Sequence, residues 1–185
     1  MSDTPLHSWL RGGKHSTECT GPLSAWLAQN ISREATILDA GCGNGELLQL
    51  LADSGFPALY GCDIEPGHVA HAKGLLAYRA DIVECDFVNQ VPFPGVEYDV
   101  ITAINWLHND WCAAGHATGI PARAEQAGRE LAIAKAVRRQ LKPGGLFVHD
   151  CLDLGRRAEI HGVLGWPVER QTMAKRTLYF LRKPE

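Results

Sequence analysis

The sequence lacks long apolar segments, paired cysteines and an excess of basic residues. No apolar run reaches the roughly 18 residues that a membrane helix needs, so a membrane partner is not expected. The first residues also contain no apolar run of signal-peptide length. The six cysteines are scattered without a CxxC pair. Together these absences predict a cytoplasmic protein with reduced thiols.

The charge balance excludes another class of partner. Eighteen Lys and Arg residues stand against 21 Asp and Glu residues, which gives a formal net charge of −3. A protein whose affinity depends on neutralising phosphates needs a basic excess, so no nucleic-acid partner is expected. The chain has 185 residues, of which 45% are hydrophobic and 21% are charged. This length and composition predict one globular domain over residues 1–185.

Short apolar runs alternate with helical segments along the chain. We expect strands at residues 35–40, 58–64, 81–87, 98–105, 146–151, 168–172 and 177–182. We expect helices at residues 22–30, 45–54, 68–78, 122–140 and 156–163. This order predicts an α/β fold with a Rossmann-like, doubly wound, mostly parallel seven-stranded sheet in three α/β/α layers. The last two strands have hairpin spacing, so the last strand should be antiparallel.

The strongest motif is a glycine-rich loop between a strand and a helix, in the sequence ILDAGCGNGEL. Glycines let a ligand approach the backbone closely, and the following helix offers free N–H groups to an anion. The dinucleotide fingerprint GxGxxG uses the same architecture. Here, however, the third glycine comes one position early, and Glu46 stands where that fingerprint has glycine. Asp39 also precedes the first glycine by two residues.

The pattern Asp39-x-Gly41-x-Gly43-x-Gly45 resembles motif I of the class I S-adenosylmethionine-dependent methyltransferases. Asp63 ends the second expected strand, where an acid can accept hydrogen bonds from both ribose hydroxyls. NAD-binding proteins share that feature. It therefore predicts that a nucleoside binds, but it does not distinguish NAD from S-adenosylmethionine.

Two further motifs extend the resemblance to about residues 35–151. Asp86-Phe87 ends the third strand, and the sequence LKPGGL precedes the fifth. Both are similar to elements at these places in the same family. The resemblance implies S-adenosyl-L-methionine as cofactor and S-adenosyl-L-homocysteine as product. It also implies cofactor-binding residues at the strand ends: Asp39, Gly41, Cys42, Gly43, Asp63, Ile64, Asp86, Phe87, Asn105 and Trp106.

The family's pattern gives each of these positions a role. Asp39 would orient the methionine amino group, the loop backbone from Gly41 to Gly43 would approach the cofactor, and Asp63 would hold the ribose. A helix-capping carboxylate is the alternative for Asp39. Ile64 would pack on the adenine, while Asp86 and Phe87 would read its edge. A solvated strand end is the alternative for Asp86.

The acceptor side is expected in the long segment 105–121. Asn105 and Trp106 would lie beside the reactive sulfonium, and an aromatic wall suits a cation. His108 is the candidate general base, because imidazole titrates near neutral pH. Asp110 is the second candidate catalytic residue, as a polar group that would bind the acceptor. Core packing remains the alternative for Trp106, and packing or capping for His108.

Three parts make up the expected domain: residues 1–34 as an N-terminal lid and first helix, 35–151 as the cofactor-binding core, and 152–185 as a helix and strand hairpin. A frayed terminus is the alternative to the lid. No metal is expected, because the cysteines near the strand ends lack ligand spacing and suit small apolar packing.

The sequence therefore predicts a methyltransferase that transfers a methyl group to a small-molecule acceptor by in-line displacement, as a monomer or homodimer. Two alternatives remain. One is a protein or peptide methyltransferase. The other is a protein of the same fold that binds S-adenosylmethionine without methylating anything.

Overall fold

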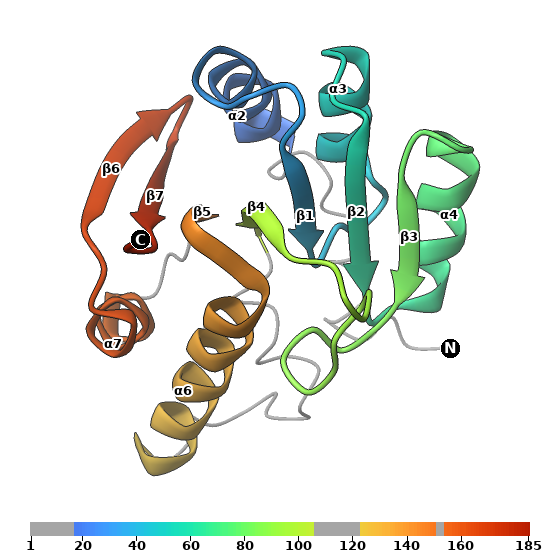
Figure 1. Cartoon of the computed structure of the whole chain (residues 1–185). Helices are drawn as coiled ribbons and strands as arrows, with labels where there is room; N and C mark the ends of the chain where they lie inside the picture. The colour runs from blue at the N-terminus through green and yellow to red at the C-terminus, as the bar shows by residue number, and fades with distance from the viewer. Residues whose placement is uncertain (1–16, 106–122, 151–153) are drawn as a thin grey trace, which may run out of the picture.

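The computed structural model describes residues 17–105, 123–150 and 154–185. Seven strands form one sheet in the order β3-β2-β1-β4-β5-β7-β6, which Figure 1 shows as a twisted row. Their bounds are β1 Thr36–Ala40, β2 Ala58–Asp63, β3 Asp81–Glu84, β4 Tyr98–Ala103, β5 Leu141–His149, β6 Val168–Met173 and β7 Arg176–Arg182.

Strand direction agrees with the expected fold class. β1, β2, β3, β4 and β5 pair in parallel, whereas β7 is antiparallel to both β5 and β6. The predicted Rossmann-like sheet with an antiparallel last strand is confirmed. The order reverses at β1, because β2 and β3 lie on one side of it and β4 lies on the other. In open sheets of this kind, ligands bind beyond the carboxyl ends of the strands at that reversal.

Helices cover both faces of the sheet (Figure 1). Their bounds are α2 Thr17–Asn30, α3 Glu46–Asp53, α4 Pro66–Leu76, α6 Arg123–Gln140 and α7 Leu154–Leu164. Buried leucines of α2, α3 and α4 form one core with the sheet, and buried aliphatic residues of α6 and α7 form a second core on the other face. The described helices thus pack against both faces of the sheet, and the carboxyl ends of its parallel strands form an edge that we call the rim of the sheet.

Two element boundaries differ from the sequence-based expectation by five residues, more than any other. α2 begins at Thr17 instead of Pro22, so this proline lies inside the helix. Proline fits best in a first turn, which is why the sequence placed the start there. β5 begins at Leu141 instead of Leu146, and its pairing with β4 shifts register between the two. The Lys142–Gly145 turn is therefore an irregularity within the strand.

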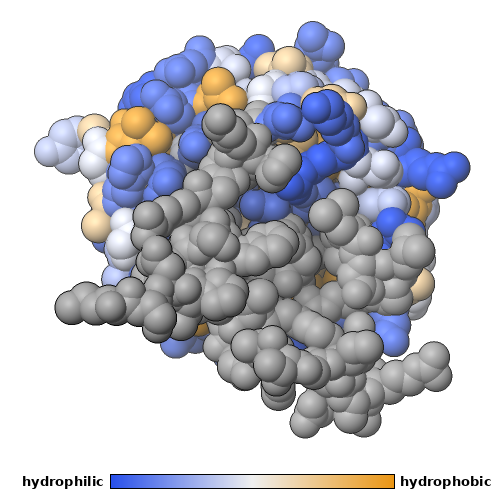
Figure 2. Space-filling model, turned by 180° about the vertical axis from the view of Figure 1, so that it is seen from behind, coloured by the Kyte–Doolittle hydropathy of each residue, from blue (hydrophilic) through white to orange (hydrophobic). Residues whose placement is uncertain are grey.

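No described helix combines the length and apolar composition that a membrane span requires. On the face shown in Figure 2, the visible described surface is mostly hydrophilic, with a few separate apolar residues. The most exposed large hydrophobic side chains of the described part include Tyr78 and Ile64. Ile64 directly follows β2, so its exposure belongs to the rim of the sheet.

Candidate functional site

The loop after β1 is tied to the end of β2. Gly41 and Cys42 both donate their backbone N–H groups to the carbonyl oxygen of Cys62, at 2.8 and 3.0 Å. Gly41, Gly43 and Gly45 all have positive φ, at 72°, 52° and 85°. Side chains rarely adopt this conformation, so the glycine pattern is needed for the turn itself.

Two of the loop glycines differ in what surrounds them. A Cβ on Gly45 would lie 3.0 Å from Leu76 Cδ1 and 3.1 Å from Ala72 Cβ, both on α4. A Cβ on Gly43 would meet no atom within 4 Å. Gly45 therefore allows α3 and α4 to pack closely. Gly43 instead faces open space, where a ligand can reach the loop backbone.

Asp63 joins the glycine loop to the end of β2. Its Oδ2 accepts a hydrogen bond of 2.9 Å from the Gly43 N–H, and its Oδ1 accepts one of 2.9 Å from the Glu65 N–H. His68 Nδ1 lies 3.5 Å from Oδ1, and the Asp63 side chain is 12% exposed. A carboxylate has about four acceptor positions, so this one is held in place and still has capacity for ribose hydroxyls.

Asp39 lies beneath the loop, near the carboxyl end of β1. It is 4% exposed, and its Oδ1 accepts a hydrogen bond of 2.6 Å from the Thr102 hydroxyl. Burial raises its pKa to about 7, the Thr102 hydrogen bond opposes the rise, and the charge of Asp63 adds to it. A buried carboxyl with one protein donor suits a cationic ligand group, which would restore its charge.

The residues after β3 and β2 are arranged differently. Val88 N–H donates to Asp86 Oδ1 at 3.0 Å, and Asn89 Nδ2 donates to Oδ2 at 2.7 Å, so Asp86 organises its own turn. Phe87 is buried in the second core, which favours a packing role for its ring. Ile64, in contrast, is 58% exposed and presents an apolar surface next to Asp63.

A polar cluster at the ends of β4, β5 and β7 contains two residues that the sequence analysis missed. Asn105 has φ of 59° and donates its N–H to Asp150 Oδ1 at 2.7 Å. Arg176 Nη1 donates to Asn105 Oδ1 at 3.1 Å and forms an ion pair with Asp150 Oδ2. Asp150 follows β5, so strand-end position alone was a signal for it. Nothing local marks Arg176, because its partner is 26 residues away.

Several predicted residues lie outside the described ranges. They are Trp106, His108 and Asp110, and residues 1–16 of the expected N-terminal lid also lie outside these ranges. The structure brings together the predicted residues Asp39, Gly43 and Asp63, and Asn105 lies two residues beyond β4, the strand adjacent to β1. Three of the rim cysteines, Cys42, Cys62 and Cys85, are buried thiols whose pKa values are raised chiefly by burial. They act as packing groups and not as nucleophiles.

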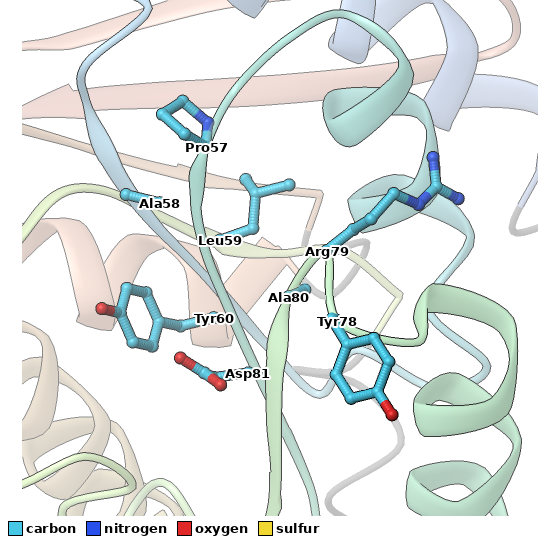
Figure 3. Close-up of a pocket in the computed structure, with 8 residues that line it drawn as sticks. All are labelled: Pro57, Ala58, Leu59, Tyr60, Tyr78, Arg79, Ala80 and Asp81. Carbon is cyan, nitrogen blue, oxygen red and sulfur yellow. The ribbon is translucent and has the colours of Figure 1, made fainter.

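A surface hollow lies at the opposite edge of the sheet. It is lined by residues 57–60 and 78–81, around the amino ends of β2 and β3 (Figure 3). In Figure 3 the rings of Tyr60 and Tyr78 lie on different sides of the two strands. The glycine loop and Asp63 follow the carboxyl ends, so this hollow is separate from the predicted cofactor residues.

Comparison with known proteins finds a matching domain family. Residues 37–119 match a family model described as a methyltransferase domain. This matched stretch is somewhat under half of the chain, and its similarity to a methyltransferase domain agrees with the resemblance of the glycine-loop motif. A ribosomal protein L11 methyltransferase from Dechloromonas aromatica is 37% identical over 97 residues, which cover 52% of this chain and 31% of that protein. The chain spans about a third of the length of most of the curated relatives it matches.

Solved structures of methyltransferases share the fold. The sugar N-methyltransferase KedS8 from a Streptoalloteichus species has a TM-score of 0.69 at 16% identity, covering 100% of this chain and 94% of that one. Magnesium protoporphyrin IX methyltransferase from Synechocystis, solved with bound S-adenosylmethionine, has a TM-score of 0.64 at 20% identity, covering 89% of this chain and 77% of that one. The match to a methyltransferase domain and the shared fold agree with the predicted family and with S-adenosylmethionine as the predicted cofactor.

The described residues of this methyltransferase domain fit the family's cofactor. Open space at the Gly43 Cβ position leaves room for a ligand against the loop. Asp63 is oriented by two backbone donors at the rim, and the buried Asp39 has a raised pKa that a ligand ammonium would lower. Ile64 supplies the exposed apolar surface that an adenine ring needs. The structure therefore offers matching surfaces for the amino acid, ribose and base.

Proposed function

We propose that this protein is an S-adenosylmethionine-dependent methyltransferase that methylates a small molecule by in-line displacement. The observation that carries the proposal is the hydrogen bond from Gly43 N–H to Asp63 Oδ2. It fixes the proposed ribose-binding carboxylate beside Gly43, a loop glycine whose Cβ position faces open space. The proposal includes a cytoplasmic location, a monomer or homodimer, and no nucleic-acid or membrane partner, on the composition and charge.

The chain's residues would hold the cofactor in a fixed orientation. Asp63 would accept hydrogen bonds from the ribose hydroxyls, Ile64 would pack on the adenine, and Asp86 would contact the edge of the base. Asp39 would accept hydrogen bonds from the methionine ammonium. The bound cofactor supplies the electrophilic methyl group, and positioning it in line with the acceptor accounts for much of the catalysis.

The acceptor is proposed to be held by the segment after β4. Asn105 marks its start, and the described contacts with Asp150 and Arg176 keep that start in place. The roles of His108 as general base and of Asp110 as an acceptor-binding catalytic residue stay predictions, because both residues lie outside the described ranges. A base is needed only where the acceptor carries a proton that must leave.

A protein acceptor is the second candidate. It is favoured by the relatives named ribosomal protein L11 methyltransferase, which match about half of this chain or more. The small-molecule proposal is favoured by KedS8, named a sugar N-methyltransferase, because nearly the whole of that chain is covered by this one. The third candidate is a protein that binds the cofactor without methylating anything. It differs from the first two candidates only in that no methyl group is transferred.

Calorimetry with S-adenosylhomocysteine tests the cofactor site. Asp63→Asn should lower the affinity by about tenfold or more, because the substituted amide offers one acceptor oxygen and faces two N–H donors. The matched control is Asp99→Asn at the other end of the sheet. Asp99 also accepts a backbone hydrogen bond, of 2.8 Å from Thr36 N–H, and pairs with Lys142.

The control variant should lose stability but keep its affinity for the cofactor product. Two results would overturn the proposal. In one, the wild-type protein binds neither S-adenosylmethionine nor S-adenosylhomocysteine. In the other, both variants bind as tightly as the wild type.

A further inference from the structure

The cluster of Asn105, Asp150 and Arg176 lies next to the glycine loop. Asp39 of β1 pairs in register with Thr102 of β4, so Asn105 leaves β4 on the strand adjacent to the loop that starts at Gly41. Arg176 Nη1 reaches Asn105 Oδ1 at 3.1 Å from the start of β7. An arginine from a distant part of the chain therefore stands at the end of the site where Asp39 lies.

The guanidinium of Arg176 uses only part of its hydrogen-bonding capacity. Arginine has five N–H donors, and Nη1 supplies the two that go to Asp150 and Asn105. The Nε and Nη2 donors have no partner among the described residues. These two donors form one planar edge, which matches the two oxygens of a carboxylate. The side chain is 12% exposed, so a ligand can reach it.

The surrounding charges favour a ligand that carries both signs. Burial is the main cause that raises the pKa of Cys19, in the first turns of α2, to about 11. The charges of Asp150 and Asp39 raise it further, and that of Arg176 lowers it. All three charged groups therefore lie around Cys19. The region between these charged groups suits an α-amino acid, whose ammonium would lie at Asp39 and whose carboxylate would lie at Arg176.

We propose that Arg176 binds the methionine carboxylate of the cofactor through its Nε and Nη2 edge. Asp150 has a positioning role, because it is fully buried and holds both Arg176 and the Asn105 backbone. This inference rests on the proposed function, since it needs the cofactor to bind with its amino-acid end over β1 and β4.

The test compares two ligands that differ only in the carboxylate: S-adenosylhomocysteine and its decarboxylated form, 5′-(3-aminopropylthio)adenosine. Calorimetry should show that the wild-type protein prefers the first by about tenfold or more, as for a charged hydrogen-bonded pair. In Arg176→Lys the preference should fall to about twofold, because a lysine keeps the charge against Asp150 but loses the planar edge. The affinity for the decarboxylated ligand should stay unchanged.

Two further variants complete the test. Arg182→Lys is the matched control, because Arg182 lies on the same strand and donates to Gly144 O at its other end. It should keep the full preference. Arg176→Met combined with Asp150→Asn removes both charges together, so no unpaired buried charge remains if Arg176→Lys does not fold. It should lose the preference as well.

The outcomes separate this inference from the proposed function. Should the wild-type protein bind neither ligand, the proposed function fails and the inference fails with it. If the wild-type protein binds both, but the Arg176 variants keep the preference, only the inference is overturned. An equal loss of affinity for both ligands would also overturn it, because that result indicates a purely structural role.

Discussion

At the scale of single residues, the site depends on backbone conformation as much as on side-chain chemistry. Gly43 and Gly45 both have positive φ, yet only Gly45 is packed against α4. The glycine pattern that identified the loop therefore combines two requirements. One is the packing of α3 on α4, and the other is access for the ligand.

Substitution of two glycines distinguishes loss of ligand access to the loop from strain of the backbone at positive φ. Gly43→Ala should lower S-adenosylhomocysteine affinity by about tenfold or more, since its methyl group would occupy the open space beside the loop. Gly55→Ala is the control, because Gly55 also has positive φ, of 89°, and also has no atom within 4 Å of a Cβ. Both changes should cost about 1–2 kcal/mol of stability in thermal unfolding. Equal affinity in the two variants would contradict the assignment of Gly43.

The raised pKa of Asp39 predicts that cofactor binding is coupled to the release of a proton. The Asp39 pKa is about 7 in the folded protein and 3.8 for an ordinary aspartate, so between these values the folded state holds a proton that the unfolded state has lost. The free energy of unfolding should therefore fall as pH rises across this window. A ligand ammonium favours the carboxylate, so binding near pH 6 should release up to about one proton.

Calorimetry in buffers of different ionisation enthalpy would measure that proton. Asp39→Asn should bind S-adenosylhomocysteine more weakly and with no proton release, whereas Thr102→Val should increase the release at neutral pH. That increase is expected because the Thr102 hydroxyl opposes the rise in the Asp39 pKa. A heat of binding that does not depend on the buffer would refute the linkage.

At the scale of elements, α7 is held to the sheet by a pair of histidines, of which His149 is fully buried and His161 is partly buried. His149 Nε2 at the end of β5 lies 3.0 Å from His161 Nε2 on α7, and Tyr179 of β7 packs against both rings. One nitrogen must donate and the other accept, so the hydrogen bond needs at least one neutral ring. The pKa of His149 is lowered to about 3, chiefly by burial and additionally by the nearby charges of His161 and Arg157.

This pair predicts a loss of stability in acid. A histidine with a lowered pKa in the folded state contributes stability above its ordinary value of 6.5, which is lost as pH falls toward 3. Each such proton gives a slope of about 1.4 kcal/mol per pH unit in urea unfolding. His149→Phe should flatten this slope between roughly pH 6 and 4.5. His71→Gln, on an exposed position of α4, should leave the slope unchanged.

The strand ends were predictable from sequence because local patterns determine them. Asp39 and Asp63 follow apolar runs that stop at turn residues, so their position at the rim follows from the parallel sheet. The start of α2 was not predictable in this way, because packing in the first core overrides the preference of Pro22. Arg176 was missed for a similar reason. Its contact with Asp150 exists only because β7 pairs with β5.

At the scale of the whole molecule, the two kinds of similar protein differ in how much of their length is matched by this chain. The structural match covers 94% of KedS8, whereas the 97 residues matched in sequence cover only 31% of the L11 methyltransferase from Dechloromonas aromatica. Most of that longer protein has no counterpart in the matched region. Ligands of open α/β sheets bind beyond the carboxyl ends of the strands, so we expect the acceptor to bind at the rim of this sheet.

Labelled cofactor would identify the acceptor class. S-adenosylmethionine with an isotopically labelled methyl group is incubated with a cell extract that has been separated into a small-molecule filtrate and a protein fraction. The label should enter the filtrate with the wild-type protein and not with Asp63→Asn. Label in the protein fraction would favour the alternative of a protein acceptor. Cofactor binding without label in either fraction would favour a protein that does not methylate.

The position of β7 has a consequence for synthesis of the protein. This strand follows the other six in the chain, yet it lies inside the sheet between β5 and β6. While the chain is being made, β5 therefore has an unpaired edge, and Asp150 has no guanidinium beside it until Arg176 has emerged. Exposed strand edges promote association with other chains. The nascent protein is thus most vulnerable to aggregation in the interval between the synthesis of β5 and that of β7.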